Sequence, residues 1–443
     1  MSALITPDTK CISNRTSGRL IEVRGLSIPF PQIPIPVQFG TEFEGERVRD
    51  NDMFLECGGR RTDMVEWVTS RHTSGVENGK IEVNGPDITD VAAGSSLPLA
   101  LIVEVAGKDM ERGFEPVLER QIHRIVNYIQ GVMHTGQRDT AYLRVSKQAV
   151  AKGFRLTHLG TALHRSLRHE FGSIFDRLQV KIYTIADKVE EIAEKARKAY
   201  YKRDARIDRM IDEETDTYYS CTICQSTAPT HVCIISPERA GQCGFNWLDG
   251  RVSNRINPFG PNQPVQKGEI IDSTGGQWQG VNEFVYKASG GKNRRYNLYS
   301  IVNSPIPISG IGECVAAVVP GCNGIMTVNR DYIGETPCGM EFNNLLNIAG
   351  GGLSTSGFSG HAKHDITQRK YLTGEGGLLR LVWMPKNLKK EINERLRARV
   401  EELGITDFPD KIADEDIGTS EEAILPFLRD KRHPALNLAP LLG

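Results

Sequence analysis

Apolar and polar positions alternate between two periods over the first half of the chain. Short apolar or alternating runs, typical of strands, occur at GKIEVNGPDI, SLPLALIVEVAG, AYLRVS and QVKIYTI. Helical spacing separates them at FEPVLERQIHRIVNYIQGVM and LGTALHRSLRHEF. In the first of these helices we expect Leu118, Ile122, Ile125 and Ile129 to face the core. Strands that alternate with amphipathic helices predict an α/β fold.

Two further segments flank this pattern. PFPQIPIPVQFG, residues 29–40, repeats proline with apolar residues, which predicts an extended arm lying on the surface. The charged segment 187–214 begins with Asp187 as a predicted N-cap and contains neither Gly nor Pro. It predicts one long helix whose basic positions between 195 and 209 form a solvated face with i,i+4 ion pairs, rather than a site for an anionic partner.

The composition changes after residue 214 to loops rich in Cys, Gly and Pro. We therefore predict an N-terminal tail at 1–27, an α/β domain at 28–214 ending in the charged helix, and a metal-cluster domain at 215–443 with a C-terminal helix and tail. The predicted C-terminal helix begins at Pro385 and ends at Gly404. Its expected apolar face consists of Leu388, Ile392, Leu396, Val400 and Leu403.

Net charge and hydropathy limit the classes of partner. The chain of 443 residues has a formal net charge of -1, which gives no electrostatic argument for nucleic acid or a membrane surface. The opening MSALITPDTKCISNR lacks the apolar run of a signal peptide, and 18 consecutive apolar residues occur nowhere. We expect a cytoplasmic protein that binds neither nucleic acid nor membrane. In such a protein the nine cysteines are expected to be metal ligands or buried thiols rather than disulfides.

Four of these cysteines lie close together in the chain, in the pattern Cys221-x2-Cys224-x8-Cys233-x9-Cys243. Structural zinc usually takes two close cysteine pairs, or cysteines with histidines, whereas here one close pair precedes two separate cysteines. That spacing favours a 4Fe-4S cluster. A zinc site and four unligated buried thiols are the alternatives. His231 lies within the loop, and we expect it to be a hydrogen-bonded structural residue rather than a ligand.

A glycine-rich segment, NIAGGGLSTSGFSGHAKH at 347–364, is a weaker candidate. It permits two functional interpretations, a phosphate-binding loop or a metal site that uses His361 and His364. Because no strand-to-helix pattern surrounds it, a flexible loop is the favoured interpretation.

Several long motifs resemble a known family. They are PVQFGTEFEGERVRDNDMFLECGG, LPLALIVEVAGKDM, VSKQAVAKGFRL, CTICQSTAPTHVCIISPERAGQCGFNWLDG, INPFGPNQPVQKGE, GQWQGVNEFVY and LVWMPK. They resemble the β-subunit of the acetyl-CoA decarbonylase/synthase complex, in the carbon monoxide dehydrogenase/acetyl-CoA synthase family, and the resemblance covers nearly the whole chain. The length is similar to that of the short form, which lacks the N-terminal docking domain of the longer form.

The resemblance implies two consecutive α/β domains, the C-terminal one carrying the iron-sulfur loop, and a role in anaerobic one-carbon metabolism of the Wood-Ljungdahl type. In the family, a cysteine thiolate bridges a 4Fe-4S cube to a proximal nickel, which is linked to a distal nickel. A methyl group from a corrinoid iron-sulfur protein, carbon monoxide and coenzyme A combine there into acetyl-CoA. By position Cys221, Cys224, Cys233 and Cys243 match the cube ligands, with Cys224 as the bridge.

The sequence departs from the family at the nickel site. The family holds its second nickel with Cys-Gly-Cys followed by Glu-Cys, and aligning on Glu313 and Cys314 puts Ser309, Gly310 and Ile311 in those three places. A serine hydroxyl is a hard oxygen donor and isoleucine has no donor, whereas low-valent nickel needs soft thiolates.

Two further positions bear on this site. Thr227 stands where bacterial members place a Phe against the proximal nickel, so the pocket is expected to be altered. Cys314 permits a rescue of a metal site, but we favour a buried structural thiol, and Cys322 and Cys338 are interpreted as ordinary family positions.

Two functional hypotheses follow. In the first, the chain is a divergent 4Fe-4S paralogue in which nickel is absent or substoichiometric, working with a corrinoid protein in methyl, acyl or electron transfer. In the second, it is a working acyltransferase, a CO-methylating acetyl-CoA synthase that also binds CoA and uses an altered proximal metal. Whether the chain is an enzyme depends on residues 309–311. The motifs GPNQPVQKGE and GQWQGVNEFVY are interpreted either as partner surfaces or as structural segments.

Overall fold

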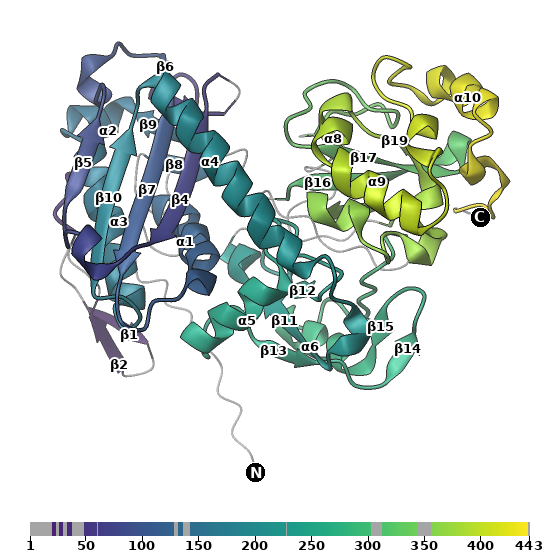
Figure 1. Ribbon diagram of the computed structural model, residues 1–443, viewed down its shortest axis with the longest axis horizontal. Coiled ribbons are helices and arrows are strands. Elements are labelled where there is room, and N and C mark those ends of the chain that lie inside the picture. The colour runs from purple at the N-terminus through teal and green to yellow at the C-terminus, as the bar shows by residue number, and fades with distance from the viewer. Residues whose placement is uncertain are drawn as a thin grey trace.

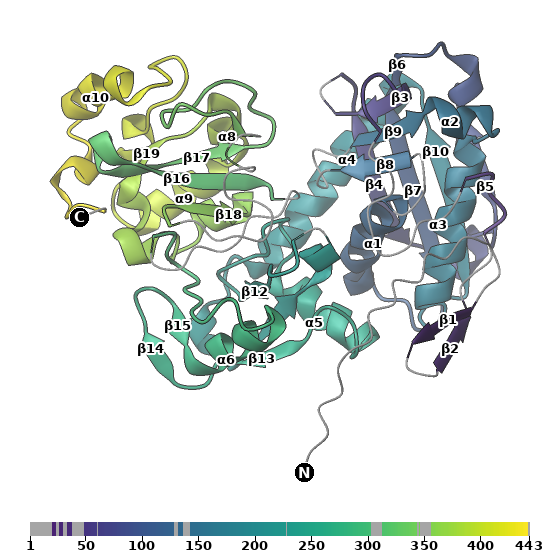
Figure 2. The ribbon, with the colours of Figure 1, turned by 180° about the vertical axis from the view of Figure 1, so that it is seen from behind.

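The chain folds as an α/β protein, which confirms the class that the hydrophobic pattern predicts. A computed structural model describes residues 20–23, 26–29, 33–37, 48–59, 61–127, 132–135, 142–226, 228–302, 312–342, 345 and 356–441. Figures 1 and 2 show one group of elements up to β10 and a second group from β11 onward. Helix α4 (Ala186–Asp204) runs from the first group to the second.

Two mixed sheets form the centre of the first group. One has the strand order β4-β7-β10-β5, and the other has the order β6-β3-β9-β8. Strand β7 pairs in parallel with β4 and antiparallel with β10, and all its residues are buried, which explains its nearly continuous apolar sequence. The bounds in the first sheet are Met64–Ser70 for β4, Ile81–Asn84 for β5, Leu99–Ala106 for β7 and Arg177–Tyr183 for β10. Those in the second are Met53–Gly58 for β3, Ser95–Leu97 for β6, Val132–Thr135 for β8 and Tyr142–Ser146 for β9.

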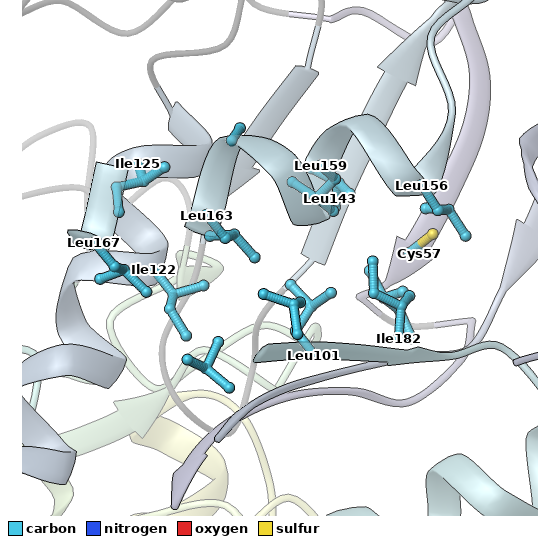
Figure 3. Close-up of a cluster of buried hydrophobic side chains, with 14 of the residues drawn as sticks. Cys57, Leu101, Ile122, Ile125, Leu143, Leu156, Leu159, Leu163, Leu167 and Ile182 are labelled. Atoms are coloured by element: carbon cyan, nitrogen blue, oxygen red, sulfur yellow. The ribbon is translucent and has the colours of Figure 1, made fainter. Parts of the chain in front are cut away.

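Helices cover both faces of the first sheet. Helices α1 (Glu115–Asn127) and α3 (Leu156–Phe171) share one apolar core with it, and α4 packs on the opposite face. Figure 3 shows Leu159 and Leu163 of α3 above Leu101 of the sheet. Of the core positions predicted in α1, all but Ile129, which lies outside the described residues, are buried. The short elements are the hairpin of β1 (Leu20–Val23) and β2 (Leu26–Pro29), and helix α2 (Lys147–Ala151).

The proline-rich arm does not simply lie on the surface. Pro29, the first residue of the arm, ends β2, and in its described segment 33–37 Ile33 and Val37 are 8% and 5% exposed and belong to the core of the first group. Pro34 and Pro36 point outward between them. Ile33, Ile35 and Val37 therefore face the core while the prolines between them are exposed, and the extended backbone of the arm stays a prediction.

The charged helix is shorter than predicted. Helix α4 ends at Asp204 rather than Glu214, and its N-cap is Ile185 rather than Asp187. Two 3-10 turns follow, Ala205–Ile207 and Asp212–Glu214, and Ile207 and Asp212 are buried. Because these two side chains are buried, the chain bends after Asp204 toward the second group of elements. A continuous solvated helix would not allow this bend.

The second group begins with a small antiparallel sheet in the order β12-β11-β13. Its central strand β11 pairs with both neighbours, and the helices α5 and α6 pack against it. The bounds are Thr217–Cys221 for β11, Cys233–Ile235 for β12, Trp247–Ile256 for α5, Pro264–Gln266 for β13 and Gln279–Ala288 for α6. A hairpin of β14 (Ile270–Asp272) and β15 (Gln277–Trp278) precedes α6.

The C-terminal part contains a four-stranded sheet, β18-β16-β17-β19, with an apolar core on each face. Its strands are β16 (Cys314–Val319), β17 (Gly324–Asn329), β18 (Phe358–His361) and β19 (Leu381–Trp383). Helices α8 (Lys386–Glu391) and α9 (Asn393–Glu402) contribute to one core, and α10 (Glu421–Asp430) contributes to the other.

The predicted C-terminal helix is interrupted. It begins after Pro385 as predicted, but it breaks at Ile392, which caps α9. Leu403 is 48% exposed, so its predicted place on the buried face is wrong. In the part of the chain that the structure describes, none of the helices combines the length and apolar character needed to cross a membrane. The domain boundary at residue 214 stays a prediction.

Candidate metal centre

Strand pairing brings the first and third cysteines of the loop together. Cys221 ends β11, Cys233 begins β12, and the two are Cα partners in this antiparallel pair. Cys224 lies in a short 3-10 turn, Ile223–Ser226, directly after β11. Cys243 returns to the same place, because its thiol is an electrostatic neighbour of both Cys221 and Cys233. The fold thus gathers cysteines that are up to 22 positions apart in the chain.

Burial disfavours the charged thiolate form of three of the four cysteines. Burial raises the pKa of Cys221 to about 12 and that of Cys233 to about 11, and it also raises the pKa of Cys243. A bound metal cluster would provide the positive charge that such thiolates need, and it would displace their protons. Soft sulfur donors of this kind fit an iron-sulfur cluster.

The donor geometry differs from that of a site for one ion. Among the residues that the structure describes, no three His, Cys, Asp or Glu side chains converge as a ligand set for a single metal ion. A 4Fe-4S cube instead binds its four thiolates through four separate irons, so its ligands do not have to converge on one point. The ligand set Cys221, Cys224, Cys233 and Cys243 stays a prediction.

Two polar side chains contact the thiols directly. His231 is fully buried, and its Nε2 lies 3.0 Å from Sγ of Cys233. The Asn262 side chain hydrogen-bonds to Cys221, and its Nδ2 also donates to the Ser220 carbonyl at 2.9 Å. His231 is therefore a hydrogen-bonded residue as predicted, but its partner is a cysteine of the candidate site.

An arginine from the first group of elements reaches the loop. Nη1 of Arg120, on α1, donates to the carbonyl oxygen of Cys243 at 2.6 Å. Its guanidinium carbon lies 5.9 Å from the centre of the Phe245 ring. No sequence pattern indicates this contact, since Arg120 precedes Cys243 by 123 positions.

The segment between Cys233 and Cys243 is fixed to the C-terminal sheet. The backbone N–H of Ala240 donates to Oδ1 of Asp365 at 2.8 Å, and Nε of Arg239 lies 3.4 Å from Oδ2 of the same carboxylate. Arg239 also donates to the Gly360 carbonyl at 3.1 Å. Burial raises the pKa of Asp365 to about 6, and the neighbouring Arg239 opposes that rise.

Glu313, directly before β16, borders the cysteine loop on another side. Its backbone N–H donates to the Gln242 carbonyl at 2.8 Å, and its Oε2 accepts from the N–H of Lys363 at 2.9 Å. Gly244 has a φ of +75°, and a Cβ there would lie 2.6 Å from Oε1 of Glu313. Only glycine allows the loop to pass this close to the carboxylate. Residues 309–311 precede Gly312 and Glu313 directly in the chain.

The other residues singled out from the sequence are either outside the described residues or packed in an apolar core. Ser309, Gly310, Ile311 and Thr227 are outside the described residues. Cys314 is fully buried in an apolar core, which agrees with a structural thiol. Buried Cys322 and partly buried Cys338 likewise pack in the core on the other face of that sheet.

The two histidines after the glycine-rich segment do not form a shared site. His361 Nε2 lies 2.8 Å from the Thr327 hydroxyl, whereas His364 Nδ1 lies 2.7 Å from a guanidinium nitrogen of Arg395. Burial lowers the pKa of both histidines to about 3. The preference for a flexible loop is wrong for residues 358–361, which form β18, because all four pair with β16 and residues 359–361 are buried. Residues 346–355 lie outside the described residues.

The two motifs considered as partner surfaces contribute to the core. Asn262 and Val265 of GPNQPVQKGE are buried, as are Trp278, Val281 and Val285 of GQWQGVNEFVY. Val265 and the three residues of the second motif pack in one apolar cluster. These five residues therefore have a structural role.

Comparison with known proteins identifies the family. Residues 35–189 match the family described as "CO dehydrogenase/acetyl-CoA synthase complex beta subunit", and residues 200–442 match the family that describes the C-terminal part of the ACS/CODH beta subunit. The chain belongs to this β-subunit family. Membership supports a place in acetyl-CoA-linked one-carbon metabolism.

Individual family members resemble the chain over most of its length. The carbon monoxide dehydrogenase/acetyl-CoA synthase subunit alpha of Moorella thermoacetica is 46% identical over 95% of this chain. The acetyl-CoA decarbonylase/synthase complex subunit beta of Methanopyrus kandleri is 40% identical over 91% of it. The chain spans 58% of the first relative and 85% of the second.

Proposed function

We propose that the chain is a 4Fe-4S protein of this family, with Cys221, Cys224, Cys233 and Cys243 as ligands. The observation that carries the proposal is that the end of the β11–β12 pair brings Cys221 beside Cys233, with Cys243 as an electrostatic neighbour of both. When bound, such a cluster supplies one-electron oxidation and reduction.

The residues around the cysteines prepare the site for a cluster. His231 and Asn262 offer hydrogen bonds to Cys233 and Cys221, and hydrogen bonds to sulfur stabilise the more negative, reduced state. Contacts of Ala240 and Glu313 anchor the loop on two sides, and a bound cluster would hold these contacts more firmly. Fixed ligands reduce the entropy that cluster binding must overcome.

We further propose that nickel is absent or substoichiometric. The support is the sequence Ser309-Gly310-Ile311 at the positions where the family has Cys-Gly-Cys. Without those two thiolates, Cys224 would be the one predicted thiolate left for nickel, because Cys314 is buried in an apolar core. Thr227 in place of a Phe agrees with a changed pocket.

A cluster without nickel fits transfer of electrons, or of methyl or acyl groups, together with a corrinoid protein. The relatives' names describe subunits of a complex, which supports a protein partner for this chain too. The second candidate is a working CO-methylating acetyl-CoA synthase that binds CoA, and the close similarity over more than nine-tenths of the chain favours it. Metal content separates the two candidates.

The test is the iron and nickel content per chain after anaerobic purification from nickel-supplemented cells. We expect about four irons with a 4Fe-4S spectroscopic signature, and nickel near zero. The designed comparison is the double variant Ser309→Cys/Ile311→Cys, which restores both thiolates and should gain nickel while its iron content stays unchanged.

Each metal tests a different part of the proposal. Nickel at about one or two per wild-type chain would overturn the loss of the nickel site and favour the synthase. Zinc in place of iron, or a chain free of metal after anaerobic reconstitution, would overturn the cluster itself. Cys322→Ser is the control variant. It removes a buried thiol outside the loop and should therefore leave the iron content unchanged.

A further inference from the structure

Arg120 links two parts of the fold that are distant in sequence. It lies on α1, whose apolar face packs in the core that α1 and α3 share with the first sheet. Its side chain crosses to the second group of elements, where it binds the carbonyl of Cys243 at 2.6 Å and lies over Phe245. A guanidinium group is charged at every physiological pH, so this contact puts a permanent positive charge beside the fourth cysteine.

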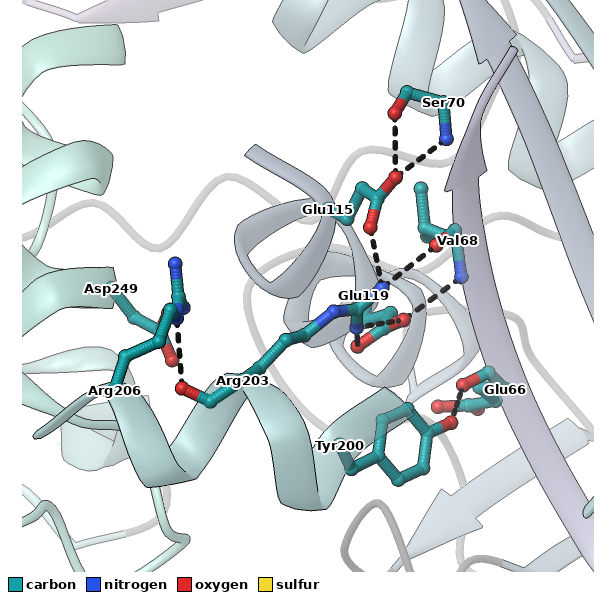
Figure 4. A network of polar contacts seen from close by, with 9 residues as sticks. All are labelled: Glu66, Val68, Ser70, Glu115, Glu119, Tyr200, Arg203, Arg206 and Asp249. Atoms are coloured by element: carbon teal, nitrogen blue, oxygen red, sulfur yellow. Dashed lines mark hydrogen bonds and ion pairs between the residues drawn. The ribbon is translucent and has the colours of Figure 1, made fainter. Parts of the chain in front are cut away.

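The helix that carries Arg120 is itself held firmly. Figure 4 shows Arg203 of α4 between Glu115 and Glu119 of α1, with guanidinium-to-carboxylate distances of 2.7 Å to both. Glu119 also accepts from the N–H of Val68 on β4 at 2.9 Å. The sheet and α4 therefore hold helix α1, and the contacts with Cys243 and Phe245 hold the guanidinium group, so its charge does not have to be reoriented when the cluster changes charge.

We propose that Arg120 is a positioning residue that holds Cys243 in place and raises the reduction potential of the cluster. This inference rests on the proposed cluster. Reduction adds one electron to the cluster, and a fixed cation nearby stabilises the added negative charge more than it stabilises the oxidised state. In this partly buried place, solvent screens the interaction less than it would at the surface.

The chain offers a matched control for the same kind of arginine. Arg255 of α5 also joins the two groups of elements, through an ion pair with Glu111 at 2.9 Å and a ring contact with Phe114 at 5.0 Å. Its side chain is 58% exposed. Arg255→Met therefore removes the same charge and a similar contact without touching the backbone of the cysteine loop.

The experiment compares wild type, Arg120→Met, Arg120→Lys and Arg255→Met, reconstituted anaerobically. Iron content is measured first, and the midpoint potential then comes from a redox titration followed by electron paramagnetic resonance. We expect Arg120→Met to become harder to reduce by on the order of tenfold, which is about 59 mV for one electron. Arg120→Lys keeps the charge and should stay near the wild-type potential, as should Arg255→Met.

The outcomes separate this inference from the proposed function. A wild-type chain that takes up no 4Fe-4S cluster overturns both. A wild-type chain with a cluster, and an Arg120→Met variant with the same iron content and potential, overturns the role of Arg120 alone. If Arg120→Met loses iron while Arg255→Met keeps it, the holding role is supported. In that case the midpoint potential of Arg120→Lys is compared with that of the wild type. Because the lysine keeps the positive charge, a shift as large as tenfold in this variant would contradict the effect of charge.

Discussion

At the scale of single residues, one charged side chain of α4, that of Arg203, is largely buried. The charge pattern predicts a solvated basic face, and Lys195 and Glu191 do form an exposed i,i+4 pair. Arg203, however, has a side chain only 12% exposed, between Glu115 and Glu119, and it also donates to the Val68 carbonyl. Removing one member of such a group leaves charges without their partner in a poorly solvated place.

We predict that Arg203→Met lowers the free energy of unfolding by about 3–5 kcal/mol. The matched control on the same helix is Arg197→Met, whose ion pair with Asp63 is about half exposed on both sides and should contribute at most about 1 kcal/mol. Urea unfolding of both variants checks the prediction. Equal effects of the two substitutions would show that burial does not matter here.

The residues that a single sequence cannot reveal are those with distant partners. Arg203 and Arg120 are separated from Glu119 and Cys243 by 84 and 123 positions, so neither pair leaves a local pattern. A structural role for His231 is predictable, because a lone histidine in a loop usually has one. Its contact with Cys233 depends on how β12 begins, and sequence spacing does not contain that information.

At the scale of elements, hydrophobic periodicity locates the strands and helices well. Strands β5, β7, β9 and β10 and helix α3 lie where the pattern predicts them, but the first predicted helix is too long, because α1 ends at Asn127 and Val132 and Met133 belong to β8. The errors are at the ends, where long-range burial decides. Helix α4 ends at Asp204 because Ile207 turns inward, and Leu403 at the end of α9 is exposed because the chain turns there through Gly404, whose φ is +69°.

His433 caps the 3-10 turn Pro434–Asn437, which follows α10, and this cap is sensitive to pH. His433 is fully buried, its Nδ1 accepts from the N–H of Ala435 at 3.2 Å, and its Nε2 lies 3.1 Å from the Leu381 carbonyl. The neutral ring satisfies both contacts, whereas a protonated ring has no acceptor for Ala435. Burial accordingly lowers the pKa of His433 from 6.5 to about 4.

This histidine should make the fold sensitive to acid. Because its folded pKa is below the unfolded one, its contribution is fully present above pH 6.5 and is lost as the pH falls through about 4. We predict that the difference in free energy of unfolding between wild type and His433→Gln shrinks by up to about 3 kcal/mol over that range. Urea titrations at several pH values measure it, and a difference independent of pH would contradict the assignment.

At the scale of the whole molecule, the candidate site is where three parts of the chain meet. The spacing of the cysteines predicts the loop, and family membership supports that interpretation. The residues that border this loop come from α1 through Arg120, from the position before β16 through Glu313, and from the 3-10 turn Lys363–Thr367 through Asp365. No local pattern could predict this arrangement, because it depends on how separate sheets pack around residues 221–243.

This arrangement predicts how the loss of iron should spread. The amide of Glu313 donates to Gln242 of the loop, and that of Ala240 donates to Asp365, so the two amides report on two sides of the loop. Anaerobic removal of iron by a chelator should lower the melting temperature, because metal-binding free energy contributes to folding. It should also speed hydrogen exchange at residues 313 and 240, while amides of β7, in the core of the first sheet, stay protected.

Faster exchange confined to the cysteines and their immediate neighbours would mean that the residues bordering the loop keep their arrangement without the cluster. Faster exchange in β7 would instead mean that the two groups of elements unfold together.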